Sequence, residues 1–476
     1  MNFRFLAGFA LTSTFSIGAI AQSAPVLSLD DCLRIALSES PTVKVADMEV
    51  QRMDYSKKEV IGQLLPNIDF GATYNRMVAK QVMYMNMDAF GSLGGGGGEG
   101  EGESSGQGAS SSSSSSRGSS GIKMGLDNSF SLGFQGSMPL IAPQLWKSLS
   151  ISDSQILRSV EAARQSKQNL VNQVKSAYYA MLLAEDSKVV IQESYDMAKL
   201  TYDTYTKLYS AGAASDYDVL RTSVAMKNVE PELLQADIAI KQTRLQLMIL
   251  MGVDSSFDFT VTDRLSNYES TMYEHSLAAM SNDYSGNADL KLLDIDSQLL
   301  EKNLAIQKLA YAPTLALIGN YNWTSMSNGS PFKNFRWNPY STVGLTLSVP
   351  IFSGGQRWHK VKEVQLQVEE LKLQRETLER SVSMQVDLAL DNIKRNVQQI
   401  ESSSESVRQA DRAHSIMERS FEIGAASYLD LRDSELALTR ARLAYYQSIY
   451  NYLIAGSELE LLQGTAPIDD YTTTEK

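Results

Sequence analysis

Aspartates placed just after two matching glycine turns are the side chains whose type and spacing could serve a function. Asp218 follows the turn at Gly212, and Asp430 and Asp433 follow the turn at Gly424. Residues three apart lie on one face of a helix, so the last two carboxylates could attract a cation together. Acids are also favourable in the first turn of any helix, because they interact with its dipole. The sequence leaves both interpretations open.

Residues for covalent or metal chemistry are scarce. The chain has three histidines and one cysteine, Cys32, and none of the strings C-x-x-C, H-E-x-x-H or G-x-x-x-x-G-K-[ST] occurs. Metal-dependent hydrolases and P-loop proteins therefore lack their defining residues here. We expect Cys32 to pack as a small hydrophobic residue. We also expect a protein that is not an enzyme and that needs no cofactor and no metal.

The charge balance bears on the class of partner. The chain has 43 Lys and Arg residues against 55 Asp and Glu residues, a formal net charge of −12. Phosphate binding needs clustered cations, so we expect no nucleic acid partner. Hydrophobic residues make up 43% of the chain, which is too many for a protein that is disordered throughout.

The first 21 residues have the features of a secretory signal peptide. Arg4 gives a short positive start, an apolar stretch follows, and the stretch ends in an A-x-A cleavage site at Ala21. The alternative is an N-terminal membrane anchor. Thr and Ser residues interrupt the apolar stretch, however, and it falls short of the ~20 residues that a spanning helix needs. No later run is long and apolar enough either, so any membrane insertion must use strands.

The chain contains an internal duplication. Three landmarks recur in the same order, with nearly equal separations for the last two: Pro66 and Pro313, Pro139 and Pro350, and Gly212 and Gly424. The first pair is separated more widely, because the first copy has additional residues that include the Gly/Ser-rich segment 91–121. We expect this segment to be a disordered loop tip. The predicted organisation is a first repeat over 22–286, a second over 287–463 and a flexible C-terminal tail over 464–476.

Each repeat begins with a helical stretch, predicted over 29–63 and 287–311, and continues with two strands around a loop. Apolar residues alternate with small or polar ones in the segments 68–75, 130–138 and 342–349. Such alternation predicts strands with one apolar face and one polar face. A soluble sandwich and a transmembrane barrel are both compatible with this pattern taken alone.

The segments after the strands favour the barrel. Residues 144–230 and 356–455 contain no proline and one glycine each, which predicts a long helix, a turn and a returning helix. The outgoing helix has about 66 residues in both repeats, roughly 100 Å, with coiled-coil spacing of its apolar residues. Four strands per chain cannot close a barrel, since single-chain barrels need about eight or more. Three chains that shared one barrel would supply twelve strands.

With these features in place, the sequence resembles the outer membrane efflux proteins, the TolC-like family. The resemblance rests on LSLDDCLRIALSESP near the N-terminus, on VPIFSGGQR, and on the two Tyr/Phe-x-x-Gly-x-x-Ser turns. It implies an α+β membrane protein of the outer membrane that extends into the periplasm. It further implies a homotrimer, with a shared transmembrane β-barrel in the lipid and long coiled-coil hairpins forming a periplasmic α-barrel. The implied partners are a periplasmic adaptor protein and an inner-membrane transporter, and the implied function is export.

The resemblance also implies functional residues at the two turns. In the family the turns are the tips at which the adaptor contacts the channel; the corresponding residues here are Gly212, Ala213, Ala214, Ser215, Gly424, Ala425, Ala426 and Ser427. Turn chemistry alone also accounts for these residues, because Gly ends one helix and Ser caps the next.

The same resemblance assigns the aspartates to a periplasmic gate. Acids matching Asp430 and Asp433 line the constriction of the closed channel, and the residue matching Asp218 joins the network that holds the helices closed. The family's basic residue in that network is replaced here by Ala426, and the aromatic residue before the second glycine, Phe421, lacks a hydroxyl. A salt-bridged lock is therefore not expected, although Tyr209 and Arg221 could contribute to a different network.

The alternative to an export duct is a structural or adhesive coiled-coil protein of the cell surface, without conductance. This alternative interpretation explains the long helices. It does not explain the repeated strand pairs or the returning helices, so the duct is the leading interpretation.

Overall fold

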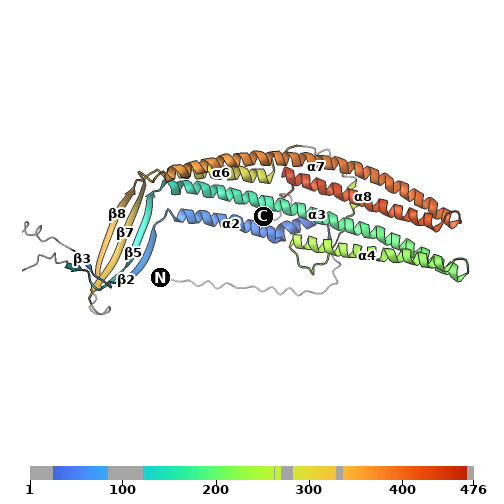
Figure 1. Cartoon of the computed structure of the whole chain (residues 1–476), viewed down its shortest axis with the longest axis horizontal. Coiled ribbons are helices and arrows are strands. Elements are labelled where there is room, and N and C mark those ends of the chain that lie inside the picture. The colour runs from blue at the N-terminus through green and yellow to red at the C-terminus, as the bar shows by residue number, and fades with distance from the viewer. Residues whose placement is uncertain (1–24, 84–121, 262, 270–281, 329–335, 469–476) are drawn as a thin grey trace, which may run out of the picture. The chain divides into compact units, whose positions relative to one another are not determined.

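The structure is a computed structural model and describes residues 25–83, 122–261, 263–269, 282–328 and 336–468. The predicted signal peptide and the Gly/Ser-rich segment 91–121 lie outside the described residues, and Figure 1 draws the whole chain. The chain divides into two compact units. The helical unit takes its described residues from Met1–Ser56, Ile151–Leu304 and Lys362–Lys476, and the sheet unit takes its described residues from Lys57–Ser150 and Ala305–Val361.

Two long hairpins make up most of the helical unit. The first consists of α3 (Pro143–Ser210) and α4 (Asp216–Met251), and the second of α7 (Gln356–Glu422) and α8 (Tyr428–Gln463). The outgoing helices α3 and α7 have 68 and 67 residues, close to the length expected from the sequence. No helix among the described residues combines the length and apolar character needed to cross a membrane.

Shorter elements pack beside the hairpins, and one prediction about them was wrong. The expected single helical stretch over 29–63 is two helices, α1 (Leu29–Glu39) and α2 (Pro41–Gly62). Ser40 lies between them with an extended ψ of 130°, because the ring of Pro41 disfavours the helical conformation in the residue before it. In the second repeat, α6 (Ala288–Leu309) matches the predicted helix. A short parallel pair, β1 (Val26–Leu27) and β6 (Thr260–Val261), and a 3-10 turn, η2 (Leu265–Tyr268), complete the unit.

The hydrophobic core of the helical unit joins helices from both repeats. Leu33 of α1, Tyr178 of α3, Met251 of α4 and Ile449 of α8 are fully buried in one cluster. Cys32 is buried in the same cluster, which confirms the expectation that it packs as a small hydrophobic residue. Burial raises the pKa of the Cys32 thiol to about 12, so this thiol stays protonated and unreactive at neutral pH.

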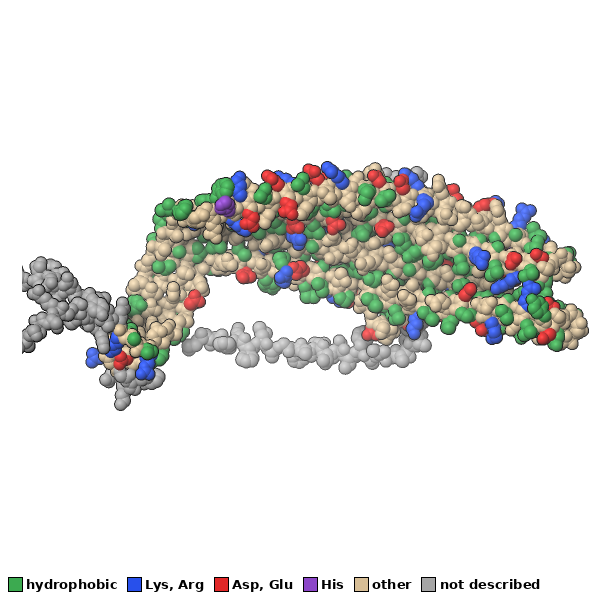
Figure 2. Space-filling model, viewed as in Figure 1, with side chains coloured by type: hydrophobic (Ala, Val, Ile, Leu, Met, Phe, Trp, Pro, Cys, Tyr) green, Lys and Arg blue, Asp and Glu red, His purple; other side chains and the backbone are tan. Residues whose placement is uncertain are grey.

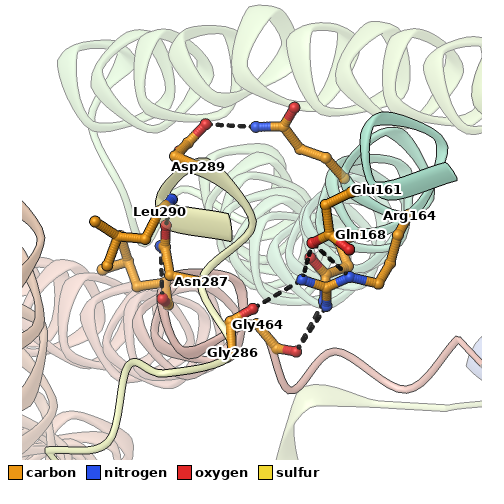
Figure 3. Close-up of polar contacts among 10 residues, drawn as sticks. Glu161, Arg164, Gln168, Gly286, Asn287, Asp289, Leu290 and Gly464 are labelled. Carbon is orange, nitrogen blue, oxygen red and sulfur yellow. Dashed lines mark hydrogen bonds and ion pairs between the residues drawn. The ribbon is translucent and has the colours of Figure 1, made fainter. Parts of the chain in front are cut away.

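A polar junction holds the end of α8 against the start of α6, as Figure 3 shows. The guanidinium of Arg164 on α3 donates to the carbonyl oxygens of Gly286 (2.9 Å) and Gly464 (3.5 Å), and the amide of Gln168 donates to Gly464 as well (2.8 Å). Asn287 donates to the carbonyl oxygen of Leu462, in the last turn of α8 (2.8 Å). Gly464, the first residue of the predicted flexible tail, is thus held in place by α3.

In the first repeat, the end of α4 lies close to the junction between α1 and α2. Gly252 ends α4 with φ +72°, and a Cβ there would meet the carbonyl oxygen of Glu39 at 2.8 Å and the ring of Pro41 at 2.9 Å. The helix boundaries follow the duplication seen in the sequence. Helices α4 and α8 both end at a left-handed glycine, and α2 and α6 both end shortly before the first pair of repeated prolines.

The sheet unit contains one four-stranded antiparallel sheet. Its strands are β2 (Asn67–Arg76), β5 (Asn128–Ile141), β7 (Thr314–Ser327) and β8 (Asn338–Ser348), in the order β2-β5-β7-β8. A second small pair, β3 (Gln81–Met83) and β4 (Ile122–Met124), extends from the first repeat's strands. The two compact units therefore cut across the two predicted repeats, because each repeat contributes strands to one unit and a hairpin to the other.

Candidate functional site

The two hairpin turns have the same backbone geometry. Gly212 and Gly424 both adopt φ +76°, and the amide that follows each glycine donates to the carbonyl oxygen five residues earlier at 2.8 Å. This 6→1 bond, with a left-handed glycine, is the Schellman arrangement that ends a helix. A Cβ at either glycine would meet no atom within 4 Å. Glycine is therefore required at both turns for its backbone conformation and not for space.

Each returning helix starts with the same reciprocal cap. Ser215 accepts from the backbone amide of Asp218 (3.2 Å) through its Oγ, and the Asp218 carboxylate accepts from the Ser215 amide (3.2 Å) and hydroxyl (2.6 Å). Ser427 and Asp430 repeat this arrangement at 3.3, 3.0 and 2.7 Å. Hydrogen bonds from the serine side chain and backbone lower the pKa of both aspartates. Both carboxylates are therefore ionised at neutral pH and engaged in capping.

The third predicted gate residue differs from the other two. Asp433 lies one turn further along α8 than Asp430 and is exposed. No hydrogen bond or ion pair involves its carboxylate among the described residues. Asp433 thus has no part in the cap, which Asp430 makes.

One aromatic contact group at the tips links the two hairpins, and each of the four long helices contributes one residue. We call it the tip cluster: Tyr205 of α3, Arg221 of α4, Phe421 of α7 and Tyr428 of α8. The ring centroid of Tyr205 lies 6.4 Å from that of Phe421 and 5.8 Å from that of Tyr428. The Arg221 guanidinium carbon lies 5.0 Å from the centroid of the Tyr428 ring.

The residues of the tip cluster meet through two ring–ring contacts and one cation–π contact. Burial raises the pKa of Tyr205 and of Tyr428, so both hydroxyls stay protonated and Arg221 meets a neutral ring. Sequence reasoning proposed two residues for an alternative network. Arg221 belongs to the tip cluster. Tyr209 is half exposed and is not one of the four cluster residues. Sequence reasoning missed Tyr205 and Tyr428, because no local pattern tells which faces of two distant hairpins meet.

Sequence reasoning also missed a buried ion pair just behind the tips. Glu435 is 5% exposed and accepts from Arg432 at 3.3 Å, one turn earlier on α8. Desolvation raises the pKa of Glu435, although the positive charge of Arg432 opposes this shift. On α7, the Nδ1 atom of His414 lies 3.2 Å from the hydroxyl of Ser434.

The described residues offer no arrangement of three or more His, Cys, Asp or Glu side chains that could hold a metal ion. Figure 2 shows basic and acidic side chains interspersed over the helices on the face in view. The described part of that face therefore has no continuous basic patch of the kind that binds nucleic acid.

Comparison with known proteins gives a consistent result. The family model described as "Outer membrane efflux protein" matches residues 104–253 and 283–465. The outer membrane protein TolC of Vibrio cholerae is 22% identical over 342 residues, which cover 71% of this chain and 78% of the relative. TolC of Escherichia coli is 21% identical over 346 residues, covering 71% and 70%. Among solved structures, the CmeC outer membrane channel of Campylobacter jejuni superposes with a TM-score of 0.68 at 15% identity, covering 98% of this chain and 94% of that one.

Proposed function

Because the chain belongs to the outer membrane efflux protein family, and is therefore an export channel of the outer membrane that extends into the periplasm, we propose that three copies build one duct. The sheet has four strands, and within the described residues the outer edges of β2 and β8 pair with no strand. An unpaired edge in lipid is excluded, because every backbone polar group there needs a partner. Three copies joined β8 to β2 would give twelve strands, enough to close a barrel.

The observation that carries this proposal is the two-faced character of the sheet. Residues directly opposite each other in antiparallel strands share a face, so Phe70, Phe134 and Tyr321 lie together. Their face is apolar across all four strands, and Val343 and Leu345 of β8 are 81% and 65% exposed on it. The opposite face is mostly small or polar, although Ile318 and Met326 of β7 also lie on it; its small or polar members include Asp69, Thr73, Ser131, Gln135, Asn320, Asn322, Thr342 and Thr346.

These two faces suit lipid on one side and water on the other. A soluble sandwich would need a second sheet to cover the apolar face, and the four-stranded sheet is the largest that the described residues form. We therefore assign the apolar face to the lipid of the outer membrane and the polar face to the lumen.

The hairpin tips are the proposed docking points for a periplasmic adaptor protein, which would connect the duct to an inner-membrane transporter. At the tips Gly212, Ala213, Gly424 and Ala425 are exposed, and neither glycine has an atom within 4 Å of its Cβ position. Such small, open turns allow another chain to approach the backbone closely. The hydroxyls of the serines that follow, Ser215 and Ser427, are engaged in the helix caps. An adaptor docked here would therefore contact the surface of the turn and not a free hydroxyl.

The periplasmic gate is proposed to combine an acidic ring with the tip cluster. Three copies of Asp433, supported by Asp430 and Asp218, would give a ring of negative charge at a narrow tip. The salt-bridged lock is absent from the sequence, and the tip cluster supplies a contact between hairpins in its place. We propose that the cation–π contact between Arg221 and Tyr428 is the part of this lock that must open.

Cysteine cross-linking along the sheet edges tests the shared barrel. Thr73→Cys in β2 is combined in turn with Thr342→Cys, Thr346→Cys or Ser348→Cys in β8, on the polar face of the sheet. Oxidation is expected to give covalent trimers for at least one of these three cysteine pairs, the one that matches the register of β8 against β2 of the next copy. The native Cys32 does not interfere, because it is buried.

The matched control moves the first cysteine to Ser131 of β5, which has strand partners of its own chain on both sides. Paired with the same β8 cysteines, it should give no covalent trimer. If the β2 series also yields only monomers, the copies do not share a barrel. Conductance of the purified protein in a planar bilayer separates the duct from an adhesive coiled-coil protein, which would conduct no ions.

A further inference from the structure

A groove of about 390 Å³ lies between the two hairpins just behind the tips. We call it the tip groove. One wall is formed by the last turns of α3, with Tyr205 and several Met, Leu and Thr side chains; the other wall is α7 and the start of α8. The side chains with aromatic or ionisable groups on the second wall are His414, Glu418, Phe421, Glu422 and Glu435.

The carboxylates that line the tip groove outnumber the cations near it. Glu435 is nine-tenths buried, and Glu418 and Glu422 are exposed. Among the described residues that line the groove there is no Lys or Arg. The guanidinium of Arg432 pairs with Glu435 at 3.3 Å from outside the lining and is itself mostly buried. The groove is therefore electrostatically complementary to a cation.

The remaining surface of the groove is apolar and aromatic. Tyr205 and Phe421 lie 6.4 Å apart between ring centroids and belong to opposite walls, and Leu200 and Leu208 add aliphatic surface. A hydrated metal ion would gain little here, because hard cations need several oxygen ligands in a defined shell. An organic cation with apolar substituents is weakly hydrated, and it can place its charge near carboxylates while its body contacts aromatic faces.

We propose that the tip groove binds a lipophilic organic cation, with Glu435 and Glu418 as counter-charges and with Tyr205 and Phe421 as the aromatic contacts. The bound cation touches α3 on one side and α7 and α8 on the other. It therefore holds the first hairpin against the second. The groove shares Tyr205 and Phe421 with the tip cluster, but binding requires neither the shared barrel nor the acidic ring nor an opening of the gate, so it stands or fails independently of the proposed function.

Isothermal titration of the full-length protein in lipid nanodiscs with tetraphenylphosphonium tests the proposal. Tetraphenylborate has the same shape and the opposite charge, and serves as the ligand control. We expect saturable binding of the phosphonium and none of the borate at the same concentrations. Partition of either ion into lipid is removed by subtracting protein-free nanodiscs.

Variants assign the binding to the groove. Glu435→Gln is expected to weaken phosphonium binding roughly tenfold or more, and Glu418→Gln severalfold, since each removes one counter-charge. Tyr205→Leu should weaken it severalfold through loss of an aromatic face. Glu401→Gln removes the same charge from an exposed position of α7 outside the groove and should leave binding unchanged.

Two results would overturn the proposal. Equal binding of phosphonium and borate would mean that charge does not select the ligand. Phosphonium binding that is unaffected by both Glu418→Gln and Tyr205→Leu would place the ion elsewhere. Glu418 is exposed and Tyr205 is partly exposed. Their variants therefore give an answer even if Glu435→Gln, which disturbs a buried ion pair, does not fold.

Discussion

Replacing the turn glycine Gly424 with alanine isolates the energetic role of the hairpin tip. The structure separates two possible costs of this change. A Cβ at Gly424 meets no atom within 4 Å, so no steric clash arises. The φ of +76° remains, and this conformation costs a residue with a side chain about 1–2 kcal/mol. We therefore expect a local destabilisation of that size, which is a factor of roughly 5–30 in the population of the open turn.

Hydrogen exchange followed by mass spectrometry measures this opening directly. The amide of Ala425 donates to the carbonyl oxygen of Ser420, and the amide of Asp430 donates to Ser427, so both are protected while the turn is intact. In Gly424→Ala these amides should exchange about 5–30 times faster, since exchange follows local opening.

Gly456→Ala is the matched control, because it makes the same substitution on the same hairpin. Gly456 lies inside α8, has no atom within 4 Å of its Cβ position and is not among the glycines with positive φ. Alanine should stabilise the helix there by about 1 kcal/mol and should not speed exchange at the tip. Unchanged exchange in Gly424→Ala, or equal acceleration in both variants, would refute the conclusion that Gly424 is required for its backbone conformation.

Three further predictions concern the gate and the groove. Arg221→Ala removes the cation–π contact with Tyr428, worth about 0.5–1 kcal/mol, and should raise the open probability of single channels severalfold; an unchanged open probability would exclude this contact from the lock. Asp433→Asn should lower selectivity for K⁺ over Cl⁻, read as a smaller reversal potential in a KCl gradient, without weakening the cap that Asp430 makes. Burial raises the pKa of Glu435, and Arg432, His414 and Glu418 face the same carboxylate. Phosphonium binding should therefore begin to fall, as the pH is lowered, at a higher pH than an exposed glutamate would produce; a flat pH profile would contradict the role of Glu435 as counter-charge.

Sequence reasoning succeeded where the physics is local. The turns at Gly212 and Gly424, and the serine caps that follow them, depend on residues within a few positions of each other. The length of the outgoing helices followed from the absence of proline and glycine. The helix boundary at Ser40, which the prediction missed, is also local: Pro41 was present in the sequence, and its effect on the preceding residue was not taken into account.

The candidate site was predicted in part. The eight turn residues and the three aspartates lie at or just beyond the hairpin tips, where sequence reasoning placed them. Their roles as adaptor contacts and gate remain predictions. The structure adds that Asp218 and Asp430 cap their helices, which leaves Asp433 as the acid without a local partner among the described residues.

Local elements could be predicted from the sequence alone: alternating strands, long helices, and glycine turns with capped returns. Each depends on residue type, on periodicity or on hydrogen bonds that span a few residues. Which faces of the hairpins meet became known only from the folded chain. Tyr205 and Tyr428 belong to different hairpins and lie far apart in the chain, yet their rings meet. Glu435 is buried, although the polar residues around it in the sequence indicate an exposed helix face. Heptad spacing shows that a helix has a packing face, but the partner of that face depends on how the whole chain folds.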